Sequence, residues 1–359
     1  MSNDIYNFSA GPAVIPKTVL EKIHDGLNDF DRGMSITEVS HRSEAFKNYA
    51  QSSEDSLRSL LSISDEYSIL FLQGGATHQF ALIPMNFASD TGSLNYLVTG
   101  TWSKKASNYA SSIANVNVVS DSSSNNFTDI PDSSTWNVND GADYFFYCAN
   151  ETVNGLEIHE PIETESPLIC DMSSTIASRP IEINKYDLIF AGAQKNLGIA
   201  GVTILIIKKN LLSRVNKGLL PILDYSKHAD DDSMLNTSPV FAWYVSGLIF
   251  DWIRDQGGVD KMAKLNQEKS SLLYNFIDQS SFYSNPVSSL YRSWMNIPFI
   301  LSRKDLDDEF IKSADDSGLL NLKGHRTVGG MRASVYNAMP IEGVKKLISF
   351  MDEFAKLHE

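Results

Sequence analysis

The segment YDLIFAGAQKNLGIAG, residues 186–201, runs from an apolar stretch into small residues and then presents Lys195. A lysine directly after a buried strand, beside Ala191, Gly192 and Ala193, is crowded and partly removed from water. This environment lowers the pKa of the amine and favours the nucleophilic form, which can form a Schiff base. An isolated lysine at a strand end more often solvates a loop, so the interpretation of Lys195 depends on the surrounding motifs.

Seven short runs rich in β-branched and aromatic residues follow one another from residue 67 onward. Several are apolar at successive positions, as expected for strands that helices cover on both faces. We therefore predict an α/β fold with a mostly parallel, seven-stranded sheet. The seven runs are 67–73, 95–99, 115–120, 143–149, 167–172, 186–191 and 202–208.

After residue 238 the pattern changes to long helices, at 241–255 and 262–277, separated by Gly257 and Gly258. A chain of 359 residues is longer than one core usually grows. We expect a large domain at 16–257 and a smaller α+β domain at 258–359, on which residues 1–15 pack. The last helix is the clearest, because Val344, Leu347, Ile348, Met351 and Phe354 share one face.

The charge balance excludes some classes of partner. With 30 basic and 44 acidic residues, the net charge is -14, which repels nucleic acid and anionic lipid. The two cysteines, Cys148 and Cys170, lie in apolar runs without metal-ligand spacing, so we expect reduced core thiols and no metal site. The sequence has neither a leader pattern nor an apolar run long enough for a membrane span, and we expect a cytoplasmic protein.

A carboxylate and a phosphate cradle are predicted near Lys195. Asp171, in PLICDMSS, ends another apolar run, and the carboxyl ends of parallel strands are where such sheets bind ligands. Pyridoxal 5′-phosphate (PLP) enzymes need such a carboxylate to keep the pyridine nitrogen protonated. The segment ILFLQGGATHQF, residues 69–80, places Ala76 and Thr77 at a helix start suited to a phosphate. Trp102 follows the next strand and could stack on the cofactor ring.

With these residues the sequence resembles the phosphoserine aminotransferases, PLP-dependent enzymes of the class V family and of fold type I. The resemblance spans nearly the whole chain, and the HR pairs set it apart from related class V aminotransferases and cysteine desulfurases. The motifs that carry it are NFSAGPA (7–13), SHRS (40–43), QGGATHQF (73–80), TGTWS (99–103), DMSS (171–174), AGAQKN (191–196), NTSPVF (236–241) and GHRTVGGMRASVYNAMP (324–340).

The resemblance implies a role for each matching position in cofactor binding. Lys195 would carry PLP as a Schiff base, Asp171 would face the pyridine nitrogen and Trp102 would stack on the ring. Thr152 and Gln194 would lie near the ring oxygen and phosphate. Ala76 and Thr77 would cradle the phosphate, which Asn236 and Thr237 of a second subunit would complete, so the resemblance implies a homodimer.

The substrates implied are L-glutamate and 3-phosphohydroxypyruvate, which give 2-oxoglutarate and O-phospho-L-serine in serine biosynthesis. Both carry a carboxylate beside the reacting carbon, and Arg332 would bind it through two parallel hydrogen bonds. The other anionic group would bind to two His-Arg pairs, His41 with Arg42 and His325 with Arg326. On an acidic protein, these pairs form the local basic cluster that anionic substrates require.

Two departures from the family pattern and two alternatives stay open. Some members have an arginine in the loop where this chain has Ala76, Thr77 and His78, and many have a proline in place of Ile199. The first alternative is another class V aminotransferase, or a lyase, with a different acceptor. The second alternative is a non-catalytic PLP-binding protein, which the intact Lys195, Asp171 and Arg332 disfavour. Within the favoured function, a phosphohydroxythreonine of pyridoxine biosynthesis could be a further substrate.

Overall fold

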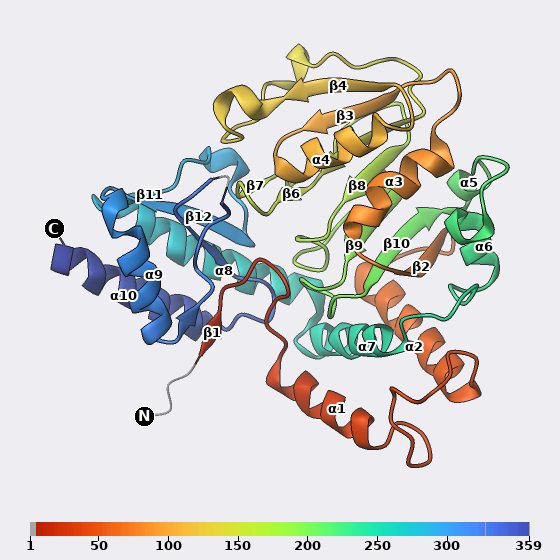
Figure 1. The fold of residues 1–359 in the computed structure, drawn as a ribbon, viewed down its shortest axis with the longest axis horizontal. Coiled ribbons are helices and arrows are strands. Elements are labelled where there is room, and N and C mark those ends of the chain that lie inside the picture. Colours follow the sequence, from red (N-terminus) through yellow and green to blue (C-terminus); the bar gives the residue numbers. More distant parts are fainter. Residues whose placement is uncertain (1–4, 327, 359) are drawn as a thin grey trace.

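The computed structural model describes residues 5–326 and 328–358, whose central element is a seven-stranded sheet (Figure 1). The strand order is β2-β10-β9-β8-β5-β3-β4. All neighbouring pairs are parallel except those of β10, which runs antiparallel to both β2 and β9. The prediction of a mostly parallel, seven-stranded sheet is confirmed. The strands are β2 (Tyr67–Gln73), β3 (Leu94–Val98), β4 (Val116–Asp121), β5 (Tyr144–Cys148), β8 (Leu168–Asp171), β9 (Leu188–Gly192) and β10 (Val202–Lys208).

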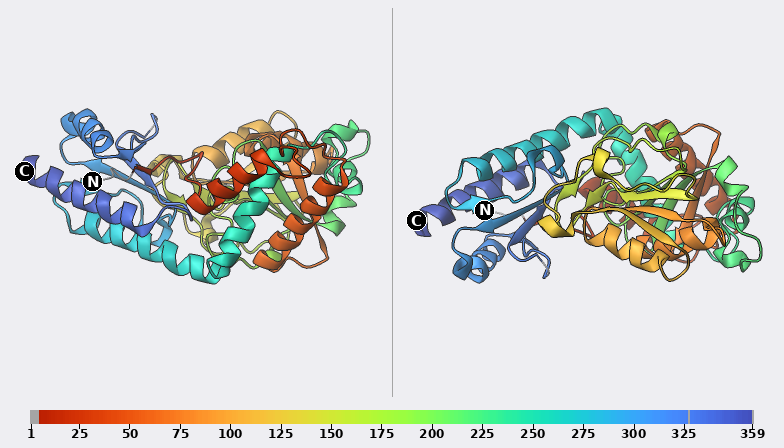
Figure 2. Two further views of the ribbon diagram at one scale, coloured as in Figure 1. Left: turned by 90° about the horizontal axis from the view of Figure 1, so that it is seen from below. Right: turned by 90° about the horizontal axis from the view of Figure 1, so that it is seen from above.

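Helices cover both faces of this sheet, which explains why its strands are apolar at successive positions (Figure 2). On one face α1 (Lys17–Asn28), α2 (Glu44–Leu61) and α7 (Val240–Asp255) enclose an apolar cluster, in which Phe71 stacks on Trp243 at 4.1 Å between ring centroids. On the other face α3 (Ala76–Phe87) and α4 (Thr101–Ala110) pack on Leu70 and Phe146. The central strands β5 and β9 are buried along their whole length.

The C-terminal part has its own apolar cluster and a separate antiparallel sheet of β11 (Tyr283–Ser284), β12 (Asn296–Leu301) and β14 (Met331–Ser334). Three helices pack on it: α8 (Gly258–Gln279), α9 (Asp307–Asp316) and α10 (Ile341–His358). In α10, four of the five residues predicted to share a face are buried, and Ile348 is partly buried beside them. β1 (Tyr6–Asn7) pairs with β13 (Leu319–Leu320), and Phe8 is buried in the same cluster.

A short hairpin connects the two parts at the carboxyl ends of the parallel strands. It follows β5 directly and consists of β6 (Asn150–Glu151) and β7 (Leu156–Glu157). The backbone N–H of Ser293 donates to the carbonyl of Gly155 at 3.0 Å, and the Asn150 amide donates to Asn296 Oδ1 at 2.8 Å. The hairpin therefore contacts the segment that leads into β12.

Two short helices complete the fold, α5 (Lys209–Leu212) and α6 (Tyr225–Asp230). Within residues 5–326 and 328–358, none of the helices has the length and apolarity needed to span a bilayer.

Candidate active site

Lys195 lies in a tight loop that joins the neighbouring strands β9 and β10. The loop is closed at its base, because the N–H of Ala193 donates to the Val202 carbonyl at 3.1 Å. Gly198, with φ +154°, lies so close to α7 that a Cβ there would overlap the Ser246 hydroxyl. The Lys195 amine donates to Thr152 Oγ1 at 3.2 Å. Burial lowers the pKa of this amine, although the Asp171 carboxylate favours its charged form.

Asp171 is the last residue of β8, next to β9 in the sheet. Its Oδ1 accepts hydrogen bonds from the N–H of Ser173 at 2.9 Å and from the hydroxyl of Ser173 at 2.6 Å. Burial raises the pKa of this carboxyl group, while the Lys195 amine and Ser173 act in the opposite direction. The structure thus places an acid and an amine at the ends of neighbouring strands of the sheet.

Trp102 and Thr152 border the same amine. Trp102 is the second residue of α4, and its ring centroid lies 6.0 Å from Lys195 Nζ. The indole Nε1 is buried and has no hydrogen-bond partner among the described residues. Thr152 is buried in the turn of the β6–β7 hairpin. The ring and the hydroxyl therefore lie beside the amine, and a buried donor is left for a ligand.

The N-terminus of α3 is open. Gly74 has φ +98°, and Gly75 is the N-cap residue and supplies no side-chain cap. In the described part of the chain, the N–H groups of Ala76 and Thr77 have no acceptor, and no atom lies within 4 Å of a Cβ built on Gly75. Free N–H groups at a helix N-terminus attract anions, so this end can hold a phosphate.

Arg332 lies on β14, opposite Pro298 of β12. Its side chain is half-buried, and Nε has no partner within the residues that the structure describes. Burial lowers the pKa of this guanidinium group, whereas Tyr336 raises it. A half-buried guanidinium with an unpaired buried donor can bind a carboxylate.

The His-Arg pairs come from two other segments of the chain, at 41–42 and 325–326. His41 is buried, and it lines a groove with Thr237 and residues 199–201. Arg42 is exposed, and Arg326 lies in an exposed turn before β14. Among the described residues, neither arginine forms a hydrogen bond or ion pair with Lys195, Asp171 or Arg332.

The remaining predicted residues lie around the lysine loop and the α3 loop. The Gln194 carbonyl accepts from the N–H of Ala13 at 2.9 Å. The Thr237 carbonyl accepts from the Gln73 side chain, and Asn236 lines a cavity with Gly74 and His78. Asn236 and Thr237 are therefore close to the α3 loop of their own chain.

Two features of the site were not predicted from the sequence. The first is the segment 10–13, which packs on Lys195: a Cβ on Gly11 would lie 3.6 Å from Lys195 Cγ. The second is Glu151, a fully buried carboxylate that accepts from the N–H of Trp102 and from the N–H of Ser103, both at 2.8 Å. An acidic residue two positions after the apolar run 143–149 was the available signal for it.

Comparisons with known proteins show the family of this chain. Residues 5–347 match the class V aminotransferase family. Phosphoserine aminotransferase from Pseudomonas fluorescens (strain SBW25) is 49% identical over 360 residues, which cover 100% of both chains. The solved phosphoserine aminotransferase of Bacillus circulans subsp. alkalophilus is 40% identical, with a TM-score of 0.97 over 100% of both chains.

A second solved structure, the PLP-bound phosphoserine aminotransferase of Trichomonas vaginalis, is also 40% identical to this chain. It has a TM-score of 0.94, over 97% of this chain and 100% of that one. The chain therefore belongs to the class V aminotransferases and, within them, to the phosphoserine aminotransferases.

Proposed function

We propose that this enzyme binds PLP at Lys195 and transfers the amino group of L-glutamate to 3-phosphohydroxypyruvate, giving 2-oxoglutarate and O-phospho-L-serine. The observation that carries the proposal is the grouping of an amine of lowered pKa, a buried carboxylate, an indole with an unpaired N–H and an open helix N-terminus at one edge of the sheet. These features match the aldehyde, the pyridine nitrogen, the ring and the phosphate of PLP. The related T. vaginalis enzyme binds PLP.

Each residue of the site has one task in this proposal. Asp171 would pair with the ring nitrogen, Trp102 would cover the ring, and Thr152 and Gln194 would lie near its oxygen and phosphate. The N–H groups of Ala76 and Thr77 would bind the phosphate. When bound, PLP supplies an electron sink for the pair of electrons released at the substrate α-carbon. The Lys195 amine takes the proton from that carbon, which its lowered pKa favours.

Substrate selection would come from Arg332 and the His-Arg pairs. Arg332 has a free buried donor for the carboxylate beside the reacting carbon. His41 with Arg42, and His325 with Arg326, would bind the distal carboxylate or phosphate. Because Arg42 forms no hydrogen bond or ion pair with Lys195 or Arg332 among the described residues of its own chain, its role supports a homodimer, in which Asn236 and Thr237 would complete the neighbouring phosphate cradle.

The buried free thiols Cys148 and Cys170 support a cytoplasmic location, since reducing compartments preserve free thiols.

Absorption spectra and rates test the proposal. The purified enzyme should show the visible band of lysine-bound pyridoxal, and glutamate should remove it. Lys195→Ala should lose the band and at least ~10³-fold in turnover, because the proton-transferring amine is gone. Lys185→Ala, which changes an exposed lysine paired with Glu163, is the control and should keep both.

The acceptor is tested by comparing 3-phosphohydroxypyruvate with hydroxypyruvate, pyruvate and glyoxylate. We expect the phosphorylated acid to react fastest by a factor of at least ~100, since an acceptor without the phosphate leaves cationic groups of the site unpaired. Equal rates would contradict the assignment of the substrate.

A further inference from the structure

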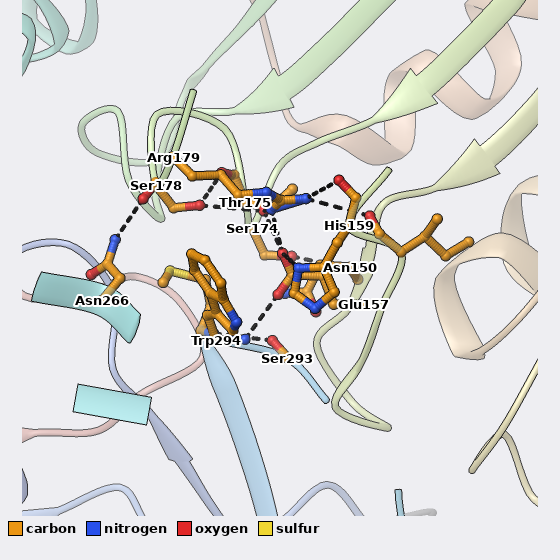
Figure 3. Close-up of polar contacts among 12 residues, drawn as sticks. Asn150, Glu157, His159, Ser174, Thr175, Ser178, Arg179, Asn266, Ser293 and Trp294 are labelled. Atoms are coloured by element: carbon orange, nitrogen blue, oxygen red, sulfur yellow. Dashed lines mark hydrogen bonds and ion pairs between the residues drawn. The ribbon is translucent and has the colours of Figure 1, made fainter. Parts of the chain in front are cut away.

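The β6–β7 hairpin contains two fully buried carboxylates with different surroundings. Glu157 pairs with the guanidinium of Arg179 at 2.6 Å and also accepts from the N–H of Trp294 at 2.8 Å (Figure 3). Among the described residues, Glu151 has no cationic hydrogen-bond partner, and its two oxygens accept from the backbone N–H groups of Trp102 and Ser103 at the start of α4. A buried carboxylate without an ion pair is costly. The position of Glu151 therefore calls for a functional explanation.

Glu151 is one of three side chains that accept hydrogen bonds from the N–H groups at the N-terminus of α4. Its Oε2 accepts from the N–H of Trp102 and its Oε1 from the N–H of Ser103, each at 2.8 Å. Asn154 Oδ1 accepts from the N–H of Thr101 at 3.2 Å, and Ser103 Oγ accepts from the N–H of Gly100 at 3.1 Å. The first turn of α4 is thus tied to the hairpin, and the backbone of Trp102 is tied with it.

Gly100 shows how closely the hairpin approaches α4. Its φ of −179° is extended backbone that any residue can adopt, yet a Cβ there would overlap the Cγ and Cδ atoms of Glu151. The glycine is required by the close approach of the Glu151 side chain and not by its backbone conformation. A substitution at Gly100 can therefore displace the carboxylate while its charge is kept.

The hairpin also touches the reacting amine. Thr152, the residue after Glu151, accepts from Lys195 Nζ at 3.2 Å, and the Trp102 ring centroid lies 6.0 Å from the same nitrogen. We propose that Glu151 is a positioning residue, whose carboxylate holds the Trp102 backbone so that the indole faces the Lys195 amine and covers the cofactor ring. This inference rests on the proposed binding of PLP.

A double-mutant cycle tests whether Glu151 acts through Trp102. Glu151→Gln replaces one acceptor oxygen by an NH₂ group, which cannot accept from the backbone N–H it would face. We expect apoenzyme with Glu151→Gln to bind PLP about tenfold more weakly, as measured by titration of absorbance and of protein fluorescence. In a Trp102→Ala background the same change should cause no further loss, because contacts in one network are not additive.

Three outcomes would overturn the inference. The first is wild-type PLP affinity in Glu151→Gln, and the second is a full tenfold loss when Trp102 is already absent. The third is an unchanged PLP affinity in Gly100→Ala, because this variant should also weaken PLP binding. A wild-type apoenzyme that binds no PLP would instead contradict the proposed function.

Glu157→Gln is the matched control for a merely structural effect. The residue has the same burial and lies in the same hairpin, but its partners are Arg179, Thr175, Trp294 and His159. This variant should unfold at a lower temperature, because it leaves the partly buried charge of Arg179 without its ion-pair partner, and should keep PLP affinity within about threefold of wild type. If both variants lost PLP affinity in proportion to their loss of thermal stability, the role of Glu151 would be structural only.

Discussion

The helices α3 and α4 begin in the same way and use their N-termini differently. Each follows a strand of the central sheet, β2 or β3, and each has a glycine at the N-cap, Gly75 or Gly100. In α4 the first N–H groups are all bound by side chains of the chain itself. In α3 the N–H groups of Ala76 and Thr77 have no acceptor within the described residues. The same strand–glycine–helix unit thus leaves N–H groups free for an anion only where the protein supplies no acceptor of its own.

The difference depends on the hairpin that follows β5. Glu151 and Asn154 belong to this hairpin and reach α4, which lies beside it. At α3, as far as the structure describes the chain, the only side chain that bonds the N-cap is that of His78. Its Nδ1 accepts from the N–H of Gly75 at 3.3 Å and leaves the next two N–H groups free. Supplying α3 with its own acceptor should therefore make its N-terminus behave like that of α4. Weakening the acceptor at α4 should have the opposite effect on that helix.

The largest effect is expected from Gly75→Asp, which gives α3 a carboxylate cap. The N-cap residue has φ −117° and ψ 173°, and a Cβ there meets no atom within 4 Å, so aspartate fits without strain. The new carboxylate should displace the phosphate and weaken PLP binding by at least ~100-fold. It should also make the apoenzyme more stable than the Gly75→Ala variant by about 1 kcal/mol, the usual difference between an aspartate and an alanine at an N-cap.

Gly75→Ala is the control for this substitution, because it fills the same space without an acceptor and should leave the apoenzyme without the added stability. PLP titration and urea unfolding of the two variants measure both effects. Unchanged PLP affinity in Gly75→Asp would show that α3 does not hold the phosphate.

A smaller effect is expected from Thr77→Val, which removes one hydroxyl at the open end and preserves the shape. Loss of one hydrogen bond to a charged group should weaken PLP binding by about tenfold. Thr101→Val is the matching change at α4, where the hydroxyl donates to Asn154 Oδ1 at 3.2 Å. Thr101→Val should leave PLP affinity unchanged. Equal losses of PLP affinity in the two variants would show that the N-termini of α3 and α4 do not differ in phosphate binding.

The smallest effect concerns the pH dependence of stability. Burial raises the pKa of Glu151 above its ordinary value of 4.5, although hydrogen bonds from Ser103 and Trp102 oppose this. The folded apoenzyme then keeps this proton to a higher pH than the unfolded chain does. Its stability should fall as the pH rises from 4.5 through the raised pKa, and the loss should persist above it.

Urea unfolding measures this decline, when the wild-type apoenzyme and the Glu151→Gln variant are each unfolded over a series of pH values. The decline is the difference between the two profiles of unfolding free energy against pH. The glutamine variant should lack the decline, whereas Asp171 and Lys195, which lie nearby, titrate in both proteins. Parallel profiles would mean that Glu151 does not change its protonation in this range.

The sheet was largely predictable, because burial on both faces forces apolar residues at successive positions. The predicted limits of β2 and β10, 67–73 and 202–208, coincide with those in the structure. The antiparallel course of β10 was not predicted. A signal was present in the chain, since the link from Gly192 to Val202 is too short for the crossover of a dozen or more residues that a parallel neighbour needs.

The site was predictable where it depends on strand ends. Lys195 and Asp171 follow apolar runs, and parallel strands bring such ends to one edge. Glu151 was missed because sequence periodicity does not show that a carboxylate will be buried against backbone N–H groups. The contacts of Arg42 with an anionic group stay a prediction, since they depend on a second subunit and not on the fold of one chain.

The antiparallel course of β10 also decides how Lys195 can move. Its loop leaves β9 and enters β10 directly, so both ends belong to one hydrogen-bonded ladder inside the sheet. A swing of the loop backbone would break that ladder, and the amine must instead travel by rotation about its own four methylene groups. We therefore expect the amide hydrogens of Ala193 and Leu197 to exchange with deuterium as slowly as those of the central strands.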